Sequence, residues 1–134
     1  MKAKKSGVTL PLYLSPISAG FPTPANDEIT EAIDLNTYLI RNKPATYLLR
    51  VQGSSLLGAG ILPDDILVVD ASRRPDSGKI VVASLDGEFV VKRLVKEKGA
   101  LYLKSENPAY SPIRLTAEMD GSIVGVVVGV VRKL

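Results

Sequence analysis

Short runs of apolar and β-branched residues, separated by turn residues, make up the chain from residue 46 onward. Runs of this length and spacing predict strands rather than helices. Asp86-Gly87 and Lys98-Gly99 are typical of the tight turns that join neighbouring strands of a hairpin. The pattern therefore predicts a mainly β protein with a curled or barrel-like antiparallel fold. The predicted strands are Thr46–Val51, Ile66–Asp70, Ile80–Ser84, Glu88–Val95, Leu101–Lys104, Ile113–Leu115 and Ser122–Val131.

The first 33 residues have a different pattern, because four prolines and two glycines interrupt them. This density excludes a helix or a long strand and predicts an extended N-terminal arm over 1–33. Asp34 then offers an N-cap, and apolar residues at helical spacing predict one short helix that runs to Arg41. Asn42-Lys43-Pro44 ends it. We expect residues 34–134 to form a single compact domain.

Two apolar segments resemble targeting or membrane signals. Residues 1–20 carry Lys2, Lys4 and Lys5 ahead of an apolar stretch, but Pro11 and Pro16 interrupt that stretch, so we expect no secretory signal. The run Ile123–Val131 is too short to span a membrane as a helix and is predicted to be a buried strand. We therefore expect a cytoplasmic protein that does not associate with membranes.

Composition narrows the chemistry more than charge does. The net charge is only +3, with 17 basic and 14 acidic side chains, so no direct sequence-specific binding of nucleic acid is indicated. The chain has no cysteine, which excludes disulfides, thiolate metal sites and thiol nucleophiles. It has no histidine, which excludes a Ser-His-Asp triad and removes the commonest metal ligand. A hydrolase of this composition must use carboxylates, or a Ser or Thr activated by an amine.

Lys92 lies in the middle of a predicted strand, where alternate side chains share a face. Val90 and Leu94 are therefore its neighbours, and such an apolar setting lowers a lysine pKa toward the range of a general base. Taken alone, the strand favours a different interpretation: an edge lysine beside Arg93 that keeps its ammonium group in water.

The segment Gly53-Ser54-Ser55-Leu56 follows a predicted strand. A serine in this position can present its hydroxyl where backbone amides stabilise an oxyanion, and the glycine allows a substrate backbone to approach. An ordinary serine-containing turn has the same composition. In a chain without His and Cys, however, these serines and Lys92 are the complete nucleophile–base pair that the sequence offers.

The carboxylates offer a competing chemistry. The candidates lie mostly at predicted turns, where aspartate favours loop geometry, and they are Asp64, Asp65, Asp70, Asp86 and Glu88. A pair of acids can serve a glycosidase or hold a metal ion. No spacing here matches a calcium loop, and the chain has no tryptophan to stack against a sugar, so we predict no metal site and no cofactor.

Motifs along nearly the whole chain resemble those of the self-cleaving S24-type serine peptidases of the SOS response. This family includes LexA-type repressors and, more similar to this chain, UmuD-like subunits of an error-prone polymerase. The segments that carry the resemblance are Ala19-Gly20-Phe21-Pro22, Pro24-Ala25, Ile33-Asp34-Leu35-Asn36, Ala45-Thr46-Tyr47, Val51-Gln52-Gly53-Ser54-Ser55-Leu56, Gly60-Ile61, Asp64-Asp65, Asp86-Gly87-Glu88-Phe89-Val90-Val91-Lys92-Arg93-Leu94, Asn107-Pro108-Ala109-Tyr110-Ser111-Pro112-Ile113 and Gly125-Val126-Val127.

The resemblance implies a curled antiparallel fold of the LexA and signal-peptidase type. It implies that Ser55 is the nucleophile, that Lys92 is the general base and that the chain cuts itself between Ala19 and Gly20. It also implies that RecA filaments on single-stranded DNA provoke the cut. The shortened product then acts as a homodimer that joins a UmuC-type Y-family polymerase in translesion synthesis and SOS mutagenesis.

The sequence departs from the family motif V-x-G-D-S-M at two positions. Ser54 stands where the family has Asp, and Leu56 stands where it has Met. Leucine preserves the packing of methionine, whereas Ser54 places a second hydroxyl beside that of Ser55. Two alternatives stay open: a LexA-like or phage-type regulator with a partner other than a polymerase, and an inactive binding module. No helix-turn-helix pattern precedes the predicted peptidase domain, which favours the UmuD-like interpretation over a repressor.

Overall fold

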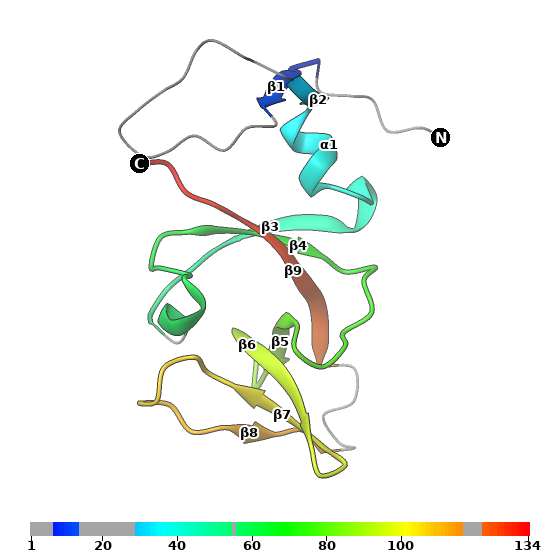
Figure 1. Ribbon diagram of the computed structural model, residues 1–134. Coiled ribbons are helices and arrows are strands. Elements are labelled where there is room, and N and C mark those ends of the chain that lie inside the picture. The colour runs from blue at the N-terminus through cyan, green and yellow to red at the C-terminus, as the bar shows by residue number, and fades with distance from the viewer. Residues whose placement is uncertain (1–6, 14–28, 55, 117–121) are drawn as a thin grey trace. The chain divides into compact units, whose positions relative to one another are not determined.

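The computed structural model describes residues 7–13, 29–54, 56–116 and 122–134. These residues fall into two compact units that divide between Arg41 and Asn42. The first contains strands β1 (Leu10–Tyr13) and β2 (Ile29–Ile33) and helix α1 (Leu35–Leu39). The second contains the remaining elements and is mainly antiparallel β, as the sequence predicted (Figure 1).

In the first unit, β1 and β2 form a two-stranded antiparallel ladder, and the sequence analysis did not predict either strand. Pro11 lies inside β1, which is compatible with a strand that pairs on one side only. Helix α1 begins as predicted, because the Asp34 carboxylate accepts hydrogen bonds from the backbone amides of Asn36 and Thr37 at 3.0 and 3.3 Å. The helix ends at Leu39, shortly before the predicted end.

The second unit is built on a seven-stranded sheet in the order β3-β4-β9-β5-β6-β7-β8. Among the described residues the order begins at β3 and ends at β8, so these strands form an open, curled sheet rather than a closed barrel. The bounds are β3 Thr46–Arg50, β4 Ile66–Asp70, β5 Ile80–Leu85, β6 Glu88–Glu97, β7 Ala100–Lys104, β8 Ile113–Arg114 and β9 Ile123–Val131. Two short 3₁₀ turns complete the unit, η1 (Lys43–Ala45) and η2 (Leu57–Ala59). Each predicted strand is present, with ends shifted by at most a few residues.

The long strand β9 joins the two halves of this sheet (Figure 1). Its C-terminal part pairs with β4, and its N-terminal part pairs with β5. Gly125 permits this close approach, because a Cβ atom there would lie 2.4 Å from Cγ1 of Val69 and 2.9 Å from the Tyr47 hydroxyl. The Tyr47 hydroxyl donates to the backbone carbonyl of Val124 at 3.1 Å and ties β3 to β9.

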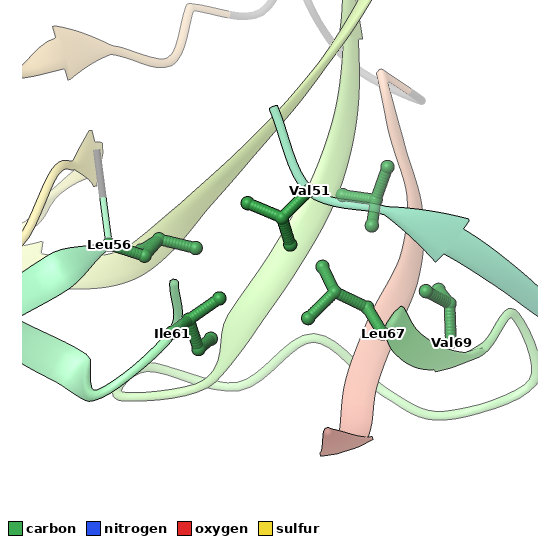
Figure 2. Close-up of a cluster of buried hydrophobic side chains, with 6 residues drawn as sticks. Val51, Leu56, Ile61, Leu67 and Val69 are labelled. Carbon is green, nitrogen blue, oxygen red and sulfur yellow. The ribbon is translucent and has the colours of Figure 1, made fainter. Parts of the chain in front are cut away.

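Alternation along β5 produces two hydrophobic clusters on opposite faces of the sheet. Val82 belongs to one cluster, and Val81 and Ala83 belong to the other. The first cluster consists of Val51, Leu56, Ile61, Leu67, Val69 and Val82. Figure 2 shows Val51, Leu56, Ile61 and Leu67 pointing toward a common interior. This cluster matters for function, because Val51 and Leu56 anchor both ends of the segment that carries the candidate nucleophile.

Candidate active site

Lys92 lies on β6, which pairs with β5 through the Asp86-Gly87 hairpin and with β7 through the Lys98-Gly99 hairpin. Asp86 and Gly87 have φ values of 50° and 79°, as a two-residue hairpin turn requires, and the resulting register sets Lys92 opposite Val81. Val81 is fully buried, and Lys92 itself is only 9% exposed. The alternative of an edge lysine with its ammonium group in water is therefore wrong for this strand.

Burial gives Lys92 the property that a lysine base needs. Removal from water disfavours the ammonium form and lowers the pKa of Lys92 below its ordinary value, while the nearby Tyr110 opposes this shift in part. Among the residues that the structure describes, no carboxylate lies within ion-pair distance of the amine. Its contacts are a hydrogen bond from Nζ to the Ser105 hydroxyl at 2.7 Å and the ring of Tyr110, whose centroid lies 4.9 Å away.

The segment from Gly53 to Leu56 lies between β3 and η2. Gly53 has a φ of 84°, a conformation that favours glycine, and Leu56 is almost fully buried. Asn107 holds this segment from the other side, since its Nδ2 donates to the Ser54 carbonyl at 3.1 Å and lies 3.4 Å from the Ser54 hydroxyl. Ser55 lies outside the described residues, so its distance to Lys92 stays a prediction.

A cleft of about 390 Å³ brings the two halves of the candidate site together. Gly53, Ser54 and Leu56 line it, and Lys92, Phe89 and Tyr110 line it as well. Phe89 is 66% exposed, so the cleft has an apolar rim that an extended peptide can contact. The predicted cleavage site, Ala19 and Gly20, lies outside the described residues and stays a prediction.

Three of the competing carboxylates, Asp64, Asp65 and Asp86, have structural roles. Asp65 is 2% exposed and forms a two-pronged ion pair with Arg132, at 2.7 and 2.6 Å. These hydrogen bonds, with one from the backbone of Leu62, lower the pKa of Asp65 to about 2. Asp64 and Asp86 have positive φ values and serve as turn residues. Within the described part of the chain, no group of three acidic residues is arranged to hold a metal ion.

With this geometry established, comparison with known proteins identifies the family. A model of the Peptidase S24-like family matches residues 11–128. The chain belongs to the Peptidase S24-like family. This family of self-cleaving serine peptidases includes the UmuD-like and LexA proteins, so the resemblance inferred from the motifs is confirmed.

Individual relatives agree with this assignment. The chain is 42% identical to protein SamA of Salmonella typhimurium, over 93% of this chain and 86% of the relative. It is 40% identical to protein ImpA of Shigella flexneri, over 92% of this chain and 83% of the relative. It is 38% identical to the LexA repressor of Anaeromyxobacter dehalogenans over 88% of this chain, but it spans only 53% of that repressor.

Among the described residues, no helix is both long enough and apolar enough to cross a membrane. The apolar C-terminal run forms strand β9 as predicted, but it is buried only in part, and Val130 and Val131 at its end are exposed.

Sequence analysis missed three residues that contact the site. Asn107 and Tyr110 stood in a recognised motif without an assigned role, and Ser105 was not singled out. A signal for Ser105 was available. The Lys98-Gly99 turn fixes the register of β6 and β7, and Arg93 pairs with Lys104. Ser105 is therefore the next position opposite Lys92.

Proposed function

We propose that this protein is a self-cleaving serine endopeptidase in which Ser55 is the nucleophile and Lys92 is the general base. The observation that carries the proposal is the state of Lys92: a buried amine without a counter-ion among the described residues, in the same cleft as Ser54. Burying a charge costs free energy unless it is paired, so a lysine kept in such a place serves a purpose other than stability. Accepting a proton from a neighbouring hydroxyl is the chemistry that this environment favours.

The reaction proceeds in two steps, formation of an ester on Ser55 and hydrolysis of that ester. The Ser55 hydroxyl gives its proton to the neutral Lys92 amine, and its oxygen attacks the carbonyl carbon of Ala19. The bond to the Gly20 nitrogen breaks, and Lys92 returns the proton to that nitrogen, which leaves an ester between Ser55 and Ala19. A water molecule then attacks the ester with Lys92 again accepting a proton, and Ser55 is regenerated when Lys92 returns it.

The cut between Ala19 and Gly20 suits both the sequence and the topology. Both residues are small, and they fall in the connection between β1 and β2. A bond in the same chain as its nucleophile is presented at high effective concentration, so tight binding of the arm is not required. Cleavage there separates residues 1–19, which include β1, from the rest of the chain.

The biological setting of the proposal is the SOS response to DNA damage in the bacterial cytoplasm. Contact with a RecA filament on single-stranded DNA triggers the cut. The shortened chain then acts as a homodimeric accessory subunit of a UmuC-type Y-family polymerase in translesion synthesis. Similarity to SamA and ImpA over more than four fifths of each chain supports a UmuD-like protein, and no cofactor is required.

Mass spectrometry of the purified protein tests the activity and the site together. Incubation at alkaline pH, or with RecA, single-stranded DNA and a nucleotide, is expected to remove residues 1–19. The rate should rise with pH, because burial lowers the pKa of Lys92 below its ordinary value and the neutral amine is the form that can accept the proton. Ser55→Ala and Lys92→Ala should abolish the cut, and Ser54→Ala should retain it. A rate that is independent of pH, or a cut lost only in Ser54→Ala, contradicts the proposal.

The similarity to a LexA repressor supports a second candidate function, that of a regulator with the same fold whose partner is not a polymerase. A binding assay with a Y-family polymerase separates the two candidates. The cleaved protein should bind it under the first proposal and should fail to bind it under the second. Complete resistance to cleavage under all conditions would instead indicate an inactive binding module.

A further inference from the structure

Three successive residues after β7, Ser105, Glu106 and Asn107, contact both sides of the candidate active site. Ser105 accepts the hydrogen bond from Lys92, Glu106 forms an ion pair with Arg93, and Asn107 holds the backbone of Ser54. This segment is close in sequence to neither the nucleophile nor the base. Its position between them therefore suggests a role of its own.

The contact between Ser105 and Lys92 follows from the β6–β7 register. The ladder pairs Leu94 with Leu103 and Arg93 with Lys104, and Ser105 continues it by one residue opposite Lys92. Lys92, Leu94 and the residues opposite them thus share one face of the sheet. The 2.7 Å bond from Nζ to the Ser105 hydroxyl thus joins a strand residue, Lys92, to the first residue after the end of β7.

The Asn107 side chain has one orientation that satisfies its contacts. Its Oδ1 accepts from the backbone amide of Ala109 at 3.0 Å, so its Nδ2 faces Ser54. The amide therefore closes its own turn with one end and donates to the carbonyl before Ser55 with the other. A carboxylate of the same shape at position 107 keeps the first contact and cannot make the second.

Glu106 contacts both β6 and the turn η2. Its carboxylate pairs with Arg93, whose guanidinium also donates to the Gly78 carbonyl at 2.7 Å. Its backbone carbonyl lies so close to η2 that a Cβ atom on Gly58 would be 2.4 Å away. The segment is thus packed directly against the turn that follows the nucleophile.

From these contacts we infer that Ser105 and Asn107 are positioning residues for the Ser55–Lys92 pair: Ser105 orients the Lys92 amine, and Asn107 holds the nucleophile segment at a fixed distance from it. The inference rests on the proposed function and deepens it by naming what aligns the two groups. General-base catalysis is sensitive to such alignment, and a displacement of about 1 Å can cost a hundredfold in rate.

Among the described residues, few titratable groups lie near Lys92, so the effect of Ser105 on it can be measured as a change in the pH dependence of cleavage. Tyr110 and Arg50 are the other titratable residues that line the same cleft, and Glu106 is engaged by Arg93. From β5 the facing residues are Val81 and Ala83, which are apolar. Loss of the Ser105 hydroxyl removes the acceptor of the ammonium form and should therefore shift the titration of Lys92 toward lower pH.

The first test is the pH profile of self-cleavage in Ser105→Ala. We expect the plateau at high pH to fall by about ten- to a hundredfold and the midpoint to move to lower pH. Ser105→Thr keeps the hydroxyl and should restore both. Ser111→Ala, an exposed serine of the same loop, is the matched control and should follow the wild-type profile. A wild-type plateau and midpoint in Ser105→Ala would overturn the role of Ser105.

The second test is Asn107→Asp, compared at high pH, where Lys92 is neutral. The carboxylate keeps the turn contact with Ala109 and loses the donation to Ser54, so the plateau should fall about tenfold with the fold retained. Circular dichroism and the thermal midpoint verify the fold. An unchanged plateau in a folded Asn107→Asp protein would overturn the role of Asn107.

A third measurement separates failure of this inference from failure of the proposed function. In a Ser55→Ala background the chain cannot cleave itself by the proposed route, and the Lys92 pKa can be followed by NMR with and without Ser105→Ala. If Ser55→Ala and Lys92→Ala still cleave, the proposed function fails. If they do not cleave and Ser105→Ala leaves the Lys92 pKa unchanged, the positioning role fails alone.

Discussion

Asp65 and Lys92 are both buried charged residues, and the structure treats them in opposite ways. Asp65 accepts two hydrogen bonds from Arg132 and one from the backbone amide of Leu62. Lys92, on the cleft side, has a hydroxyl and an aromatic ring but no described counter-ion. Folding lowers the pKa of both residues. For Asp65 this stabilises the charged form, and for Lys92 it stabilises the neutral form.

This difference between the two residues indicates that Asp65 stabilises the fold, whereas Lys92 is a candidate for a functional role. Arg132 also donates to the Gly60 carbonyl at 2.9 Å, so the Asp65 pair ties the end of β9 to the turn η2, which follows the proposed nucleophile. Lys92 forms no ion pair with any described residue, and its burial disfavours its own charge. Under the proposed function this cost is expected, because a general base must be able to lose its proton, whereas the Asp65 carboxylate has no such requirement and is fully paired.

The largest effect is expected from replacing Lys92, the buried amine that has no counter-ion among the described residues. Lys92→Met should lower self-cleavage by about a thousandfold or more, because the general base is lost. It should also raise the stability of the folded chain by about 1 kcal/mol, because a buried amine is replaced by an apolar side chain of similar length. Cleavage assays and urea unfolding measure the two effects.

Lys96→Met is the matched control for this experiment. Lys96 lies further along β6 and is exposed, so its replacement should leave both the rate and the stability close to wild type. A Lys92→Met protein that is less stable than wild type would show that Lys92 serves the fold, and the contrast with Asp65 would fail.

The next largest effect is expected from breaking the paired charge. Arg132→Met leaves the Asp65 carboxylate buried with only its backbone partner, and a buried charge without its counter-ion is strongly destabilising. The urea midpoint should fall clearly below that of Lys133→Met, which removes an exposed cation at the adjacent position. Equal midpoints would show that the pair contributes nothing to stability.

The hairpins explain how much of this arrangement could be predicted. The Asp86-Gly87 and Lys98-Gly99 turns fix the registers of β5, β6 and β7, and both were recognised in the sequence. From these registers the apolar neighbours of Lys92 follow directly, and the position of Ser105 follows as well. The fold class and the candidate base were accessible because local turn chemistry determines them.

The remaining contacts depend on pairing between distant segments. Asp65 and Arg132 are 67 residues apart and meet only because β4 pairs with β9. Asn107 and Ser54 are 53 residues apart and belong to no common ladder. The β1–β2 pair was missed because Pro11 argues against a strand in general, although an edge strand accepts it. A local sequence pattern does not show which distant segments pair, so these contacts could not be predicted from it.

A smaller effect should follow from the contact between Gly58 and Glu106. Gly58→Ala introduces a Cβ atom 2.4 Å from the Glu106 carbonyl, so the turn after the nucleophile must move away from the positioning segment. Overpacking of this kind costs about 1–3 kcal/mol, and we expect urea unfolding to show a loss in this range. The plateau rate of cleavage should fall with it. An unchanged rate and stability would show that the segment is free to adapt.

The smallest effects are expected in the pH dependence of stability, where the two buried charges act at opposite ends of the scale. The pKa of Asp65 falls from 3.8 to about 2 on folding, so its contribution is present above pH 3.8 and is lost as the pH falls toward 2. Asp70 acts in the same direction: burial opposes its charge, but hydrogen bonds from Ser72 and the nearby Arg73 outweigh this and lower its pKa. The pKa of Lys92 lies below 10.5 when folded, so the unfolded chain binds the extra proton and stability rises as the pH approaches 10.5.

Urea midpoints measured across the pH range test the two slopes separately. Asp65→Asn should flatten part of the acid slope and leave the alkaline one unchanged, because the Asp70 contribution remains. Lys92→Met should remove the alkaline rise and leave the acid slope unchanged. If Lys92→Met retains the alkaline rise, another group causes it, and the fold does not lower the pKa of the amine at position 92.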